Sequence, residues 1–408
     1  LKSVFPFKSA ACMVGARAMN PSESLKACVV LMPPIETMEQ LTAAACHLGL
    51  EVQVTSSSSE ALQKLPAAIV MGPAPENVLA QLRNQSSFRQ VFKIVLNSAV
   101  AEDVCQRLSC FDAGANMVTS SAEAVTTALS RVAKVLRSPG PYACPTCGLL
   151  LSEDALHLHM HLQHATDDNP RGPCPICKKS GGNLPVHFTN NHGPIESREP
   201  PPARYACFAW CVCRRPTDGR FLLVNEPAGI SGGRPGYWLP AGRVDSGESL
   251  SDACRREALE EAGVAVRVTG VLRFMVNSRG TLRVVFLAEP EDANNSEPKS
   301  VPDWESVGAV WADVHDLPRL KEKDYRSPDP ADLYPKVTSG ELRPHSLDTP
   351  AFRSLEALIV RLTAGEGAES ELAAVWKDIK ASMRHQASHA KMLHAWRGIS
   401  CFLFCVEM

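Results

Sequence analysis

Carboxylates at helical spacing are the residues of this sequence with the clearest potential for chemistry. Glu257, Glu260 and Glu261 stand at positions i, i+3 and i+4, so a helix would place their side chains on one face. A solvated charged face is the alternative, but it would intersperse lysines, whereas here Arg255 and Arg256 precede the acids. Because like charges at this spacing repel, the cluster predicts a bound divalent cation, and oxygen ligands suit Mg²⁺ or Mn²⁺.

The segment that carries these acids has helix signals at both ends. Ser249 can cap the first turn, with Asp252 reaching back toward it, and Gly263 can end the helix in the left-handed conformation. The sequence therefore predicts one helix between these positions, with the acids in its second half.

The acids also belong to a longer spaced motif. Gly242 is followed by five residues and Glu248, then by seven residues and the run from Arg256 to Val264. These residues match the Nudix box, G-x5-E-x7-R-E-U-x-E-E-x-G-U with U aliphatic or small, at every specified position. Residues 203–320 therefore resemble a Nudix (MutT-like) hydrolase domain. The resemblance implies an α/β/α sandwich with a mixed sheet and an enzyme that cleaves pyrophosphate bonds with Mg²⁺.

The resemblance implies roles for the residues on the helix. Glu257, Glu260 and Glu261 would ligate the metal or deprotonate the attacking water, and the spacing leaves open which glutamate is the base. Arg256 would orient one of the glutamates.

Three positions outside the helix complete the implied site. Glu248 would stabilise the loop and help to bind the metal. Gly242 would let the backbone approach the metal, where a carbonyl can serve as a ligand. Glu305, in the stretch WESVGAVW, stands where a glutamate joins the metal site or acts as the base in MutT-like enzymes.

The substrate is less closely indicated than the chemistry. The flanks YWLPAGRVDSGESL and RVVFLAEP resemble the branch of the family that hydrolyses nucleoside diphosphates and oxidised purine nucleotides. Tyr237, Trp238 and Phe274 are candidates to stack on a base, although core packing is the more frequent use of such rings. A nucleoside di- or triphosphate is therefore the expected substrate. RNA 5′-end hydrolysis, favoured by a basic aromatic groove, and a non-catalytic adaptor, favoured by a blocked pocket, are the alternatives.

Cysteines and histidines form a second candidate site, which occurs twice. C-P-x-C followed by L-x-x-H-x-x-x-x-H recurs at an interval of thirty residues, and this order of ligands resembles the C2H2 zinc fingers. We expect two structural Zn²⁺ ions, and His157 and His161 are alternatives to His159. The expected ligands are Cys144, Cys147, His159 and His164 in the first finger and Cys174, Cys177, His187 and His192 in the second.

The charge of the finger region bears on its partners. Between Pro141 and Glu199 acids outnumber bases, and the first finger would present Ser-Glu-Asp where base-reading residues are expected. Binding to duplex DNA is therefore not expected. Protein contact or self-association comes first, and contact with single-stranded RNA comes second.

The N-terminal region alternates strand and helix patterns. Apolar runs KACVVLM, EVQV, AAIVM, VFKIVLN and NMVT predict parallel strands, and amphipathic segments at 38–50, 76–82, 101–108 and 122–136 predict helices. The region resembles a flavodoxin-like response-regulator receiver, but VVLMPP, AAIVMGP and NMVTSS stand where a receiver has its acids and lysine. We predict a pseudo-receiver for docking or dimerisation, and any other flavodoxin-like domain is the alternative.

Composition and punctuation set the domain limits. The 408 residues carry a net charge of −2, which provides no long-range attraction to nucleic acid or membranes. Fifteen cysteines and the absence of a long apolar run favour a reducing cytoplasmic or nuclear location; a weakly presequence-like start makes mitochondria an alternative. The expected organisation is a multidomain α/β chain with a tail at 1–24, a receiver-like domain at 25–138, fingers at 142–194, a Nudix domain at 203–320 and a partly helical extension at 321–408.

Overall fold

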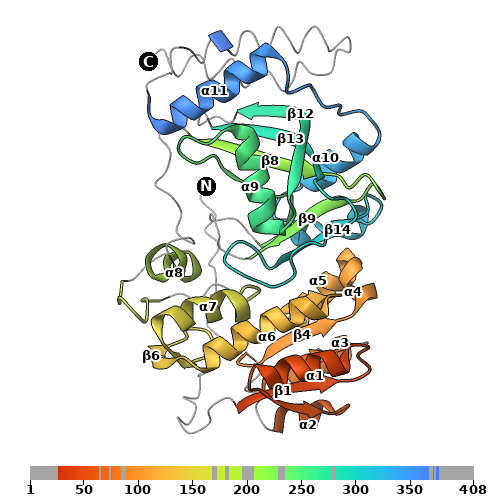
Figure 1. Ribbon diagram of the computed structural model, residues 1–408, viewed down its shortest axis with the longest axis vertical. Coiled ribbons are helices and arrows are strands. Elements are labelled where there is room, and N and C mark those ends of the chain that lie inside the picture. Colours follow the sequence, from red (N-terminus) through yellow and green to blue (C-terminus); the bar gives the residue numbers. More distant parts are fainter. Residues whose placement is uncertain are drawn as a thin grey trace, which may run out of the picture.

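The computed structural model describes residues 26–63, 66–72, 75–83, 89–167, 172–179, 183–194, 206–227, 235–276 and 281–366, with 371, 374 and 375. An N-terminal parallel-sheet domain (residues 26–138) lies at one end and a Nudix-like domain (residues 206–364) at the other (Figure 1). Finger 1 (residues 139–167) and finger 2 (residues 172–194) lie along one side. The predicted tail at 1–24 falls outside the described residues, and so does the predicted extension beyond residue 366 apart from 371, 374 and 375.

The parallel-sheet domain contains all five predicted strands. Neighbouring strands pair in parallel, in the order β2-β1-β3-β4-β5. The central strands are buried along nearly their whole length, as expected for a parallel sheet covered on both faces. The strands are β1 (Lys26–Met32), β2 (Glu51–Val54), β3 (Pro66–Met71), β4 (Phe92–Leu96) and β5 (Met117–Thr119).

Helices cover both faces of this sheet. α1 and α6 pack on one face, while α2, α3 and α5 pack on the other. The predicted helix at 101–108 is in fact two helices, because the Asp103 carboxylate accepts hydrogen bonds from the backbone of Cys105 and Gln106 and caps a new one. The helices are α1 (Met38–His47), α2 (Ser58–Gln63), α3 (Pro75–Arg83), α4 (Ser98–Glu102), α5 (Val104–Asp112) and α6 (Ala122–Leu136).

Each finger presents one helix. In finger 1, the hairpin of β6 (Pro139–Ala143) and β7 (Leu150–Leu151) leads into α7 (Glu153–Gln163), which Ser152 caps. Finger 2 contributes α8 (Leu184–His192), which Asn183 caps. α7 packs against both α6 and α8, so finger 1 lies between the parallel-sheet domain and finger 2.

The Nudix-like domain is built on two sheets and the helix that carries the acids. The first sheet has the order β11-β8-β13-β12 and is mixed, since only β8 and β13 pair in parallel; the second is antiparallel, β10-β9-β14. α9 (Leu250–Ala262) packs against both sheets in one core. The strands are β8 (Cys207–Cys213), β9 (Phe221–Glu226), β10 (Gly236–Trp238), β11 (Ala241–Arg243), β12 (Val266–Val276), β13 (Leu282–Pro290) and β14 (Gly308–Ala312).

Helices beyond residue 320 belong to the same packing. Two short 3-10 turns, η3 (Leu317–Arg319) and η4 (Glu322–Asp324), lead to α10 (Asp329–Thr338), where Tyr334 stacks on Phe221 of β9 with ring centroids 4.4 Å apart. α11 (Pro350–Ala364) packs its buried face against the same core as α9. A boundary at residue 320 is therefore too early, because side chains of α10 and α11 fill the core of this domain.

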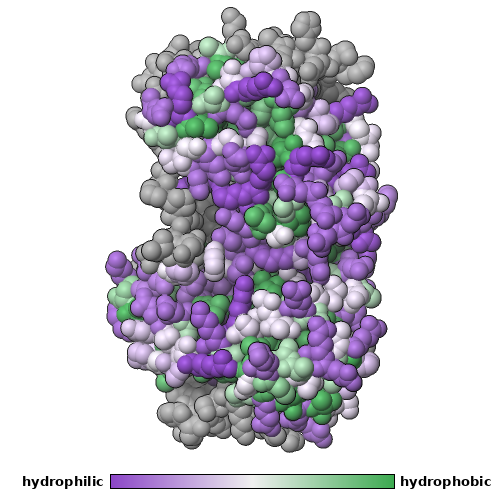
Figure 2. Space-filling view, in the orientation of Figure 1, coloured by the Kyte–Doolittle hydropathy of each residue, from purple (hydrophilic) through white to green (hydrophobic). Residues whose placement is uncertain are grey.

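One face of the molecule is predominantly polar (Figure 2). Hydrophilic residues cover most of the described surface on the face shown in Figure 2, and hydrophobic residues form scattered groups. Within the described ranges, no helix combines the length and apolar character needed to cross a membrane.

Candidate functional site

α9 presents the acidic residues as its end signals predict. The Ser249 hydroxyl accepts a hydrogen bond from the Asp252 backbone and donates one to the Asp252 carboxylate at 2.7 Å. Gly263 ends the helix at a φ of 70°. Both predicted caps are confirmed. The helix buries Glu257 and Glu261 and leaves Glu260 at its exposed edge, so the three acids share a side of the helix but differ in environment.

Arg256 ties the acids to the preceding loop. Its guanidinium donates to both carboxylate oxygens of Glu248, at 2.9 and 3.0 Å. The same group donates to Glu257 at 2.8 Å and to Glu260 at 2.9 Å. Glu248 in turn accepts from the backbone N–H of Asp245 at 3.0 Å. Arg256 therefore orients the glutamates, and Glu248 fixes the loop.

Burial disfavours the ionised forms of the two inner carboxylates, Glu257 and Glu261. It raises the pKa of Glu257 to about 8; Arg256 opposes this shift, while Glu260 and Glu305 add to it. Burial also raises the pKa of Glu261 well above its usual value, and the neighbouring Glu226 and Glu257 add to that rise. A cation among these groups would favour their ionised forms.

Gly242 allows the closest approach at this site. A side-chain carbon at that position would overlap the carboxylate of Glu257, so a larger residue would displace that carboxylate. β11 pairs with β8 here, which places the loop backbone over the helix. The glycine of the motif is explained by this contact.

Two further carboxylates face the helix. Glu305 lies close enough to Glu257, Glu260 and Glu261 for their charges to interact, and burial raises its pKa to about 7. The second is Glu226, at the end of β9, which the sequence analysis missed. Burial raises its pKa to about 7 as well; Arg326 opposes this through an ion pair at 2.6 Å.

Glu226 had a signal in the sequence, but a weak one. It ends the run FLLVNE, a strand in which all positions are buried. A charged residue in a fully buried strand is unusual. Its Oε1 atom is buried without a hydrogen-bond partner among the described residues. Arg326, its partner, follows η4, one hundred residues later in the chain, so pattern alone could not pair them.

These carboxylates fit a hard divalent cation in chemistry, although they do not form a tight cage. Hard oxygen donors with raised pKa values, facing one another with few cations among them, are what such an ion would neutralise. However, Glu257 and Glu260 are directed to Arg256, and Glu261 accepts from the backbone N–H of Ala241 at 2.9 Å. Among the described residues, only the two Cys/His groups bring three or more ligand atoms within 4.8 Å of one another.

The aromatic candidates for base stacking separate into two kinds. Tyr237 is fully buried and Phe274 is 6% exposed, and both lie in core clusters, so the structure does not offer these rings to a nucleotide. Strand alternation turned both toward the interior. Trp238 is partly exposed, with Arg326 over its ring at 5.3 Å and its indole N–H donating to Asp329 at 3.1 Å.

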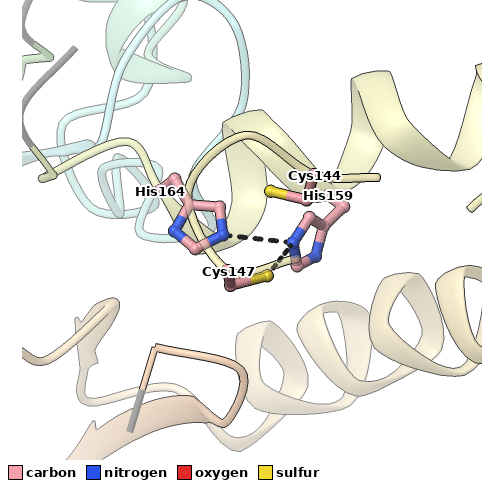
Figure 3. A group of neighbouring side chains, drawn as sticks. All are labelled: Cys144, Cys147, His159 and His164. Atoms are coloured by element: carbon pink, nitrogen blue, oxygen red, sulfur yellow. Dashed lines mark hydrogen bonds between the residues drawn. The ribbon is translucent and has the colours of Figure 1, made fainter. Parts of the chain in front are cut away.

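Finger 1 brings its four predicted ligands together. Cys144, Cys147, His159 and His164 point toward one another from the hairpin and α7 (Figure 3), with their ligand atoms within 4.8 Å. The Nε2 atom of His159 lies 3.3 Å from the sulfur of Cys147 and 3.1 Å from Nε2 of His164. His157 and His161, the alternatives, lie outside this group and pack against each other.

Finger 2 repeats the arrangement, with a carboxylate behind one ligand of each group. Cys174, Cys177, His187 and His192 have their ligand atoms within 4.8 Å. Asp167 lies 2.7 Å from Nδ1 of His164, and Glu153 of finger 1 lies 2.7 Å from Nδ1 of His192. Carboxylates in this position orient metal-binding histidines, and thiolate and imidazole donors suit Zn²⁺.

One cleft among the described residues is separate from both sites. It has a volume of about 660 Å³ and lies between the parallel-sheet domain and the loop before β14, lined among others by Arg107, Ser121 and Arg215. None of the box glutamates lines it.

Family models of known proteins match both the Nudix-like domain and the finger region. Residues 207–336 match the family model of the NUDIX domain, and residues 141–193 match that of the Drought induced 19 protein (Di19) zinc-binding domain. The first match extends beyond residue 320 into α10, in agreement with the packing described above.

Individual relatives share the same region. "Putative nudix hydrolase 1" of Caenorhabditis elegans is 29% identical over 147 residues, which cover 33% of this chain and 39% of that protein. Human "8-oxo-dGDP phosphatase NUDT18" is 35% identical over 85 residues, covering 21% of this chain and 26% of that protein. A solved NUDIX hydrolase from Nitrosomonas europaea is 26% identical and covers 34% of this chain and 93% of its own, with a TM-score of 0.27. The chain thus contains a Nudix domain and, before it, a Di19-type zinc-binding domain.

Proposed function

We propose that the chain is a Mg²⁺-dependent hydrolase that cleaves a pyrophosphate bond in a nucleoside diphosphate derivative. One observation carries the proposal: Glu257 and Glu261 of α9 lie near Glu226 and Glu305 from other elements. Burial and mutual repulsion raise the pKa values of these four carboxylates, and a bound cation would counter both effects. A non-catalytic adaptor would have no need for buried acids at this cost in stability.

Residues of this chain have separate tasks in that reaction. Glu257, Glu260, Glu261 and Glu305 would hold the ion, with the Gly242 carbonyl as a further ligand. A bound divalent ion supplies Lewis acidity toward the phosphoryl oxygens and acidifies a water. Arg256 fixes the glutamates through its bonds to Glu248, Glu257 and Glu260.

The substrate side of the site lies along Trp238. Arg326 connects this ring to Glu226, which interacts with Glu261, so the tryptophan and the carboxylates are contiguous. We assign base contact to Trp238 and phosphate contact to Arg326. Because relatives in three vertebrates are named 8-oxo-dGDP phosphatase, 8-oxo-dGDP is the first substrate to test.

The accessory regions receive structural roles. Two Zn²⁺ ions would hold the fingers. The strand order β2-β1-β3-β4-β5 is that of flavodoxin-like folds, which supports the receiver-like assignment, and the missing acids favour docking over phosphotransfer.

The test is turnover by the purified full chain with Mg²⁺. The panel contains 8-oxo-dGDP, other nucleoside di- and triphosphates, ADP-ribose, dinucleoside polyphosphates and capped RNA, and release of phosphate or mononucleotide is measured. Wild type should hydrolyse a nucleoside diphosphate, Glu257→Gln should not, and Glu291→Gln, an exposed acid away from α9, should resemble wild type. Absence of turnover across the panel would refute the proposal, and turnover of capped RNA alone would support the RNA alternative.

A further inference from the structure

The connection between β13 and β14 contacts the parallel-sheet domain, finger 1 and α9 of the Nudix-like domain. Its segment 299–307, the catalytic segment, carries Glu305 and leads into β14. In Figure 1 this connection runs over α6 and α7 on its way to β14. Its contacts show what determines the position of Glu305.

One end of the catalytic segment is anchored in the parallel-sheet domain. Val301 is buried in the core cluster of that domain. The Ser300 hydroxyl donates to the Thr119 hydroxyl at the end of β5, at 2.9 Å. Arg131 of α6 donates to the carbonyl oxygen of Pro302 at 3.0 Å.

The other side of the segment is attached to α9. The Ser306 hydroxyl donates to the carbonyl oxygen of Glu261 at 2.6 Å, and Ser306 is fully buried. Lys299 donates to the carbonyl oxygen of Glu260 at 2.5 Å and pairs with Asp303 at 2.9 Å. The Asp303 carboxylate accepts from the backbone N–H of Glu305 at 3.0 Å.

Finger 1 contacts the segment at the residue next to Glu305. The ring of His157, on α7, lies 5.9 Å from that of Trp304, measured between centroids. His157 is 4% exposed and Trp304 is partly exposed. Because Trp304 directly precedes Glu305 in the chain, its contact with His157 lies one residue from the residue that carries the carboxylate.

We propose that finger 1 is a positioning element for the Nudix site: His157, through Trp304, sets the placement of Glu305 against α9. Metal loading of finger 1 then controls the hydrolase, because α7 carries His159 and ends at His164, two of the four residues that would hold the ion. This inference rests on the proposed function for its activity readout. Trp304 and His157 are positioning residues, since neither belongs to the carboxylate cluster.

The physical basis is that the finger holds the residue directly before Glu305. Side-chain bonds from Lys299 and Ser306 to carbonyl oxygens of α9 fix the segment on either side, and the contact of Trp304 with His157 fixes the residue next to Glu305. A displacement of a catalytic group by about 1 Å can lower the rate by about 10²-fold. Loss of the finger contact is therefore sufficient to lower turnover without unfolding the Nudix domain.

The experiment compares Trp304→Ala, Trp304→Phe and His157→Ala in the full chain. We expect kcat to fall by about 10- to 100-fold with KM nearly unchanged, because a catalytic group moves while the substrate contacts remain. Affinity for Mn²⁺, used in place of Mg²⁺ and measured by titration without substrate, should weaken by about 10-fold. Zinc content and Tm should stay at the wild-type values.

Asp154→Asn is the matched control. Asp154 is an exposed residue in the first turn of the same helix and takes part in neither ring contact of His157. Its kcat and Mn²⁺ affinity should resemble wild type. Disruption of finger 1 by Cys144→Ser should reproduce the Trp304→Ala defect, and the two changes together should cost no more than one alone.

Each result decides the inference. Wild-type kcat and Mn²⁺ affinity in Trp304→Ala would overturn it, as would a full additive loss in the combined variant. If Trp304→Ala unfolds the chain, Trp304→Phe decides, since a lowered kcat at wild-type Tm supports the proposal and a wild-type kcat overturns it. If wild type hydrolyses nothing, the proposed function has failed, and Mn²⁺ affinity still tests the positioning role.

Discussion

The fingers and the Nudix helix are two ion-binding regions that differ in how far the chain itself completes them. In the fingers, four donors already converge within 4.8 Å, and Asp167 and Glu153 lie behind two of the histidines. At the Nudix helix, the carboxylates are divided between Arg256 and the Ala241 backbone. Four such donors would close a tetrahedron around Zn²⁺, whereas the carboxylates would leave ligand positions of a divalent ion open for water and phosphate.

The difference follows from donor chemistry. Thiol and imidazole groups can be brought together with little repulsion, because both are uncharged until a metal ion displaces the thiol protons. Glutamates cannot, and the folded chain holds them near one another only with raised pKa values and an arginine between them. A bound Zn²⁺ would complete the fold of each finger, whereas a divalent ion at α9 would reduce the repulsion among the glutamates that the fold holds near one another.

The largest effect should come from removing a finger ligand. Cys144→Ser breaks the group that folds finger 1, and structural Zn²⁺ in finger peptides contributes about 10–16 kcal/mol of binding free energy. Elemental analysis should find one zinc per chain in place of two, and Tm should fall. Cys174→Ser, the equivalent change in finger 2, should lower Tm less, because finger 1 packs on α6 and finger 2 packs on α7. Equal effects of the two changes would contradict this order.

Glu257→Gln should have the next largest effect, and it should separate activity from stability. Loss of one charged group at a preorganised site costs about 10²- to 10³-fold in kcat. The same change removes a buried carboxylate whose ionisation is opposed, so Tm without Mg²⁺ should stay the same or rise at pH 8. Kinetics and thermal unfolding of one preparation measure both. A variant that loses activity together with stability would indicate a structural role for Glu257.

The sequence predicted the local parts of both sites and missed the parts that depend on tertiary packing. Gly242, Glu248 and Arg256 were found because their spacing lies within one loop and one helix. Glu226 and the Trp304 to His157 contact were missed, since strand pairing and domain docking bring them in from distant positions.

The aromatic assignments show the same limit. Tyr237 and Phe274 were chosen by type, but the side of a strand that faces the core decided their environment, and both are buried. The helix at 101–108 was predicted as one because the cap at Asp103 was not recognised as a start signal. Local signals were sufficient for the five parallel strands, whose apolar runs are long and separated by polar segments.

The pH dependence of stability should distinguish the two regions further. Glu257 has a pKa of about 8, and Glu226 and Glu305 have pKa values of about 7, against an ordinary value of 4.5. Between these values the folded state binds more protons than the unfolded state, so the free energy of unfolding decreases as pH rises. This contribution is fully present below about pH 4.5 and is lost through about pH 7–8.

Thermal unfolding at about pH 6 and about pH 8 measures this effect, with zinc retained and Mg²⁺ omitted. The Tm of wild type without Mg²⁺ should fall as the pH rises. The fall should be smaller in Glu257→Gln, and it should be smaller still in wild type with Mg²⁺. An identical slope with and without Mg²⁺ would show that the carboxylates bind no ion in the folded chain.

The smallest effect concerns the contact between the fingers. Glu153, on α7, accepts from His192 of finger 2, so one finger supplies the outer partner of the other's ligand. Glu153→Gln should weaken zinc binding by finger 2 by about 10-fold, the lower end for such partners. Asp154→Asn is the matched control, because Asp154 is the exposed neighbour in the same first turn and its loss changes the helix-end charge equally. Competition with a chromogenic chelator measures both affinities. If the two variants lose the same affinity, the effect is one of helix charge, and the fingers bind their ions independently; a loss confined to Glu153→Gln means that finger 1 must fold before finger 2 reaches full affinity.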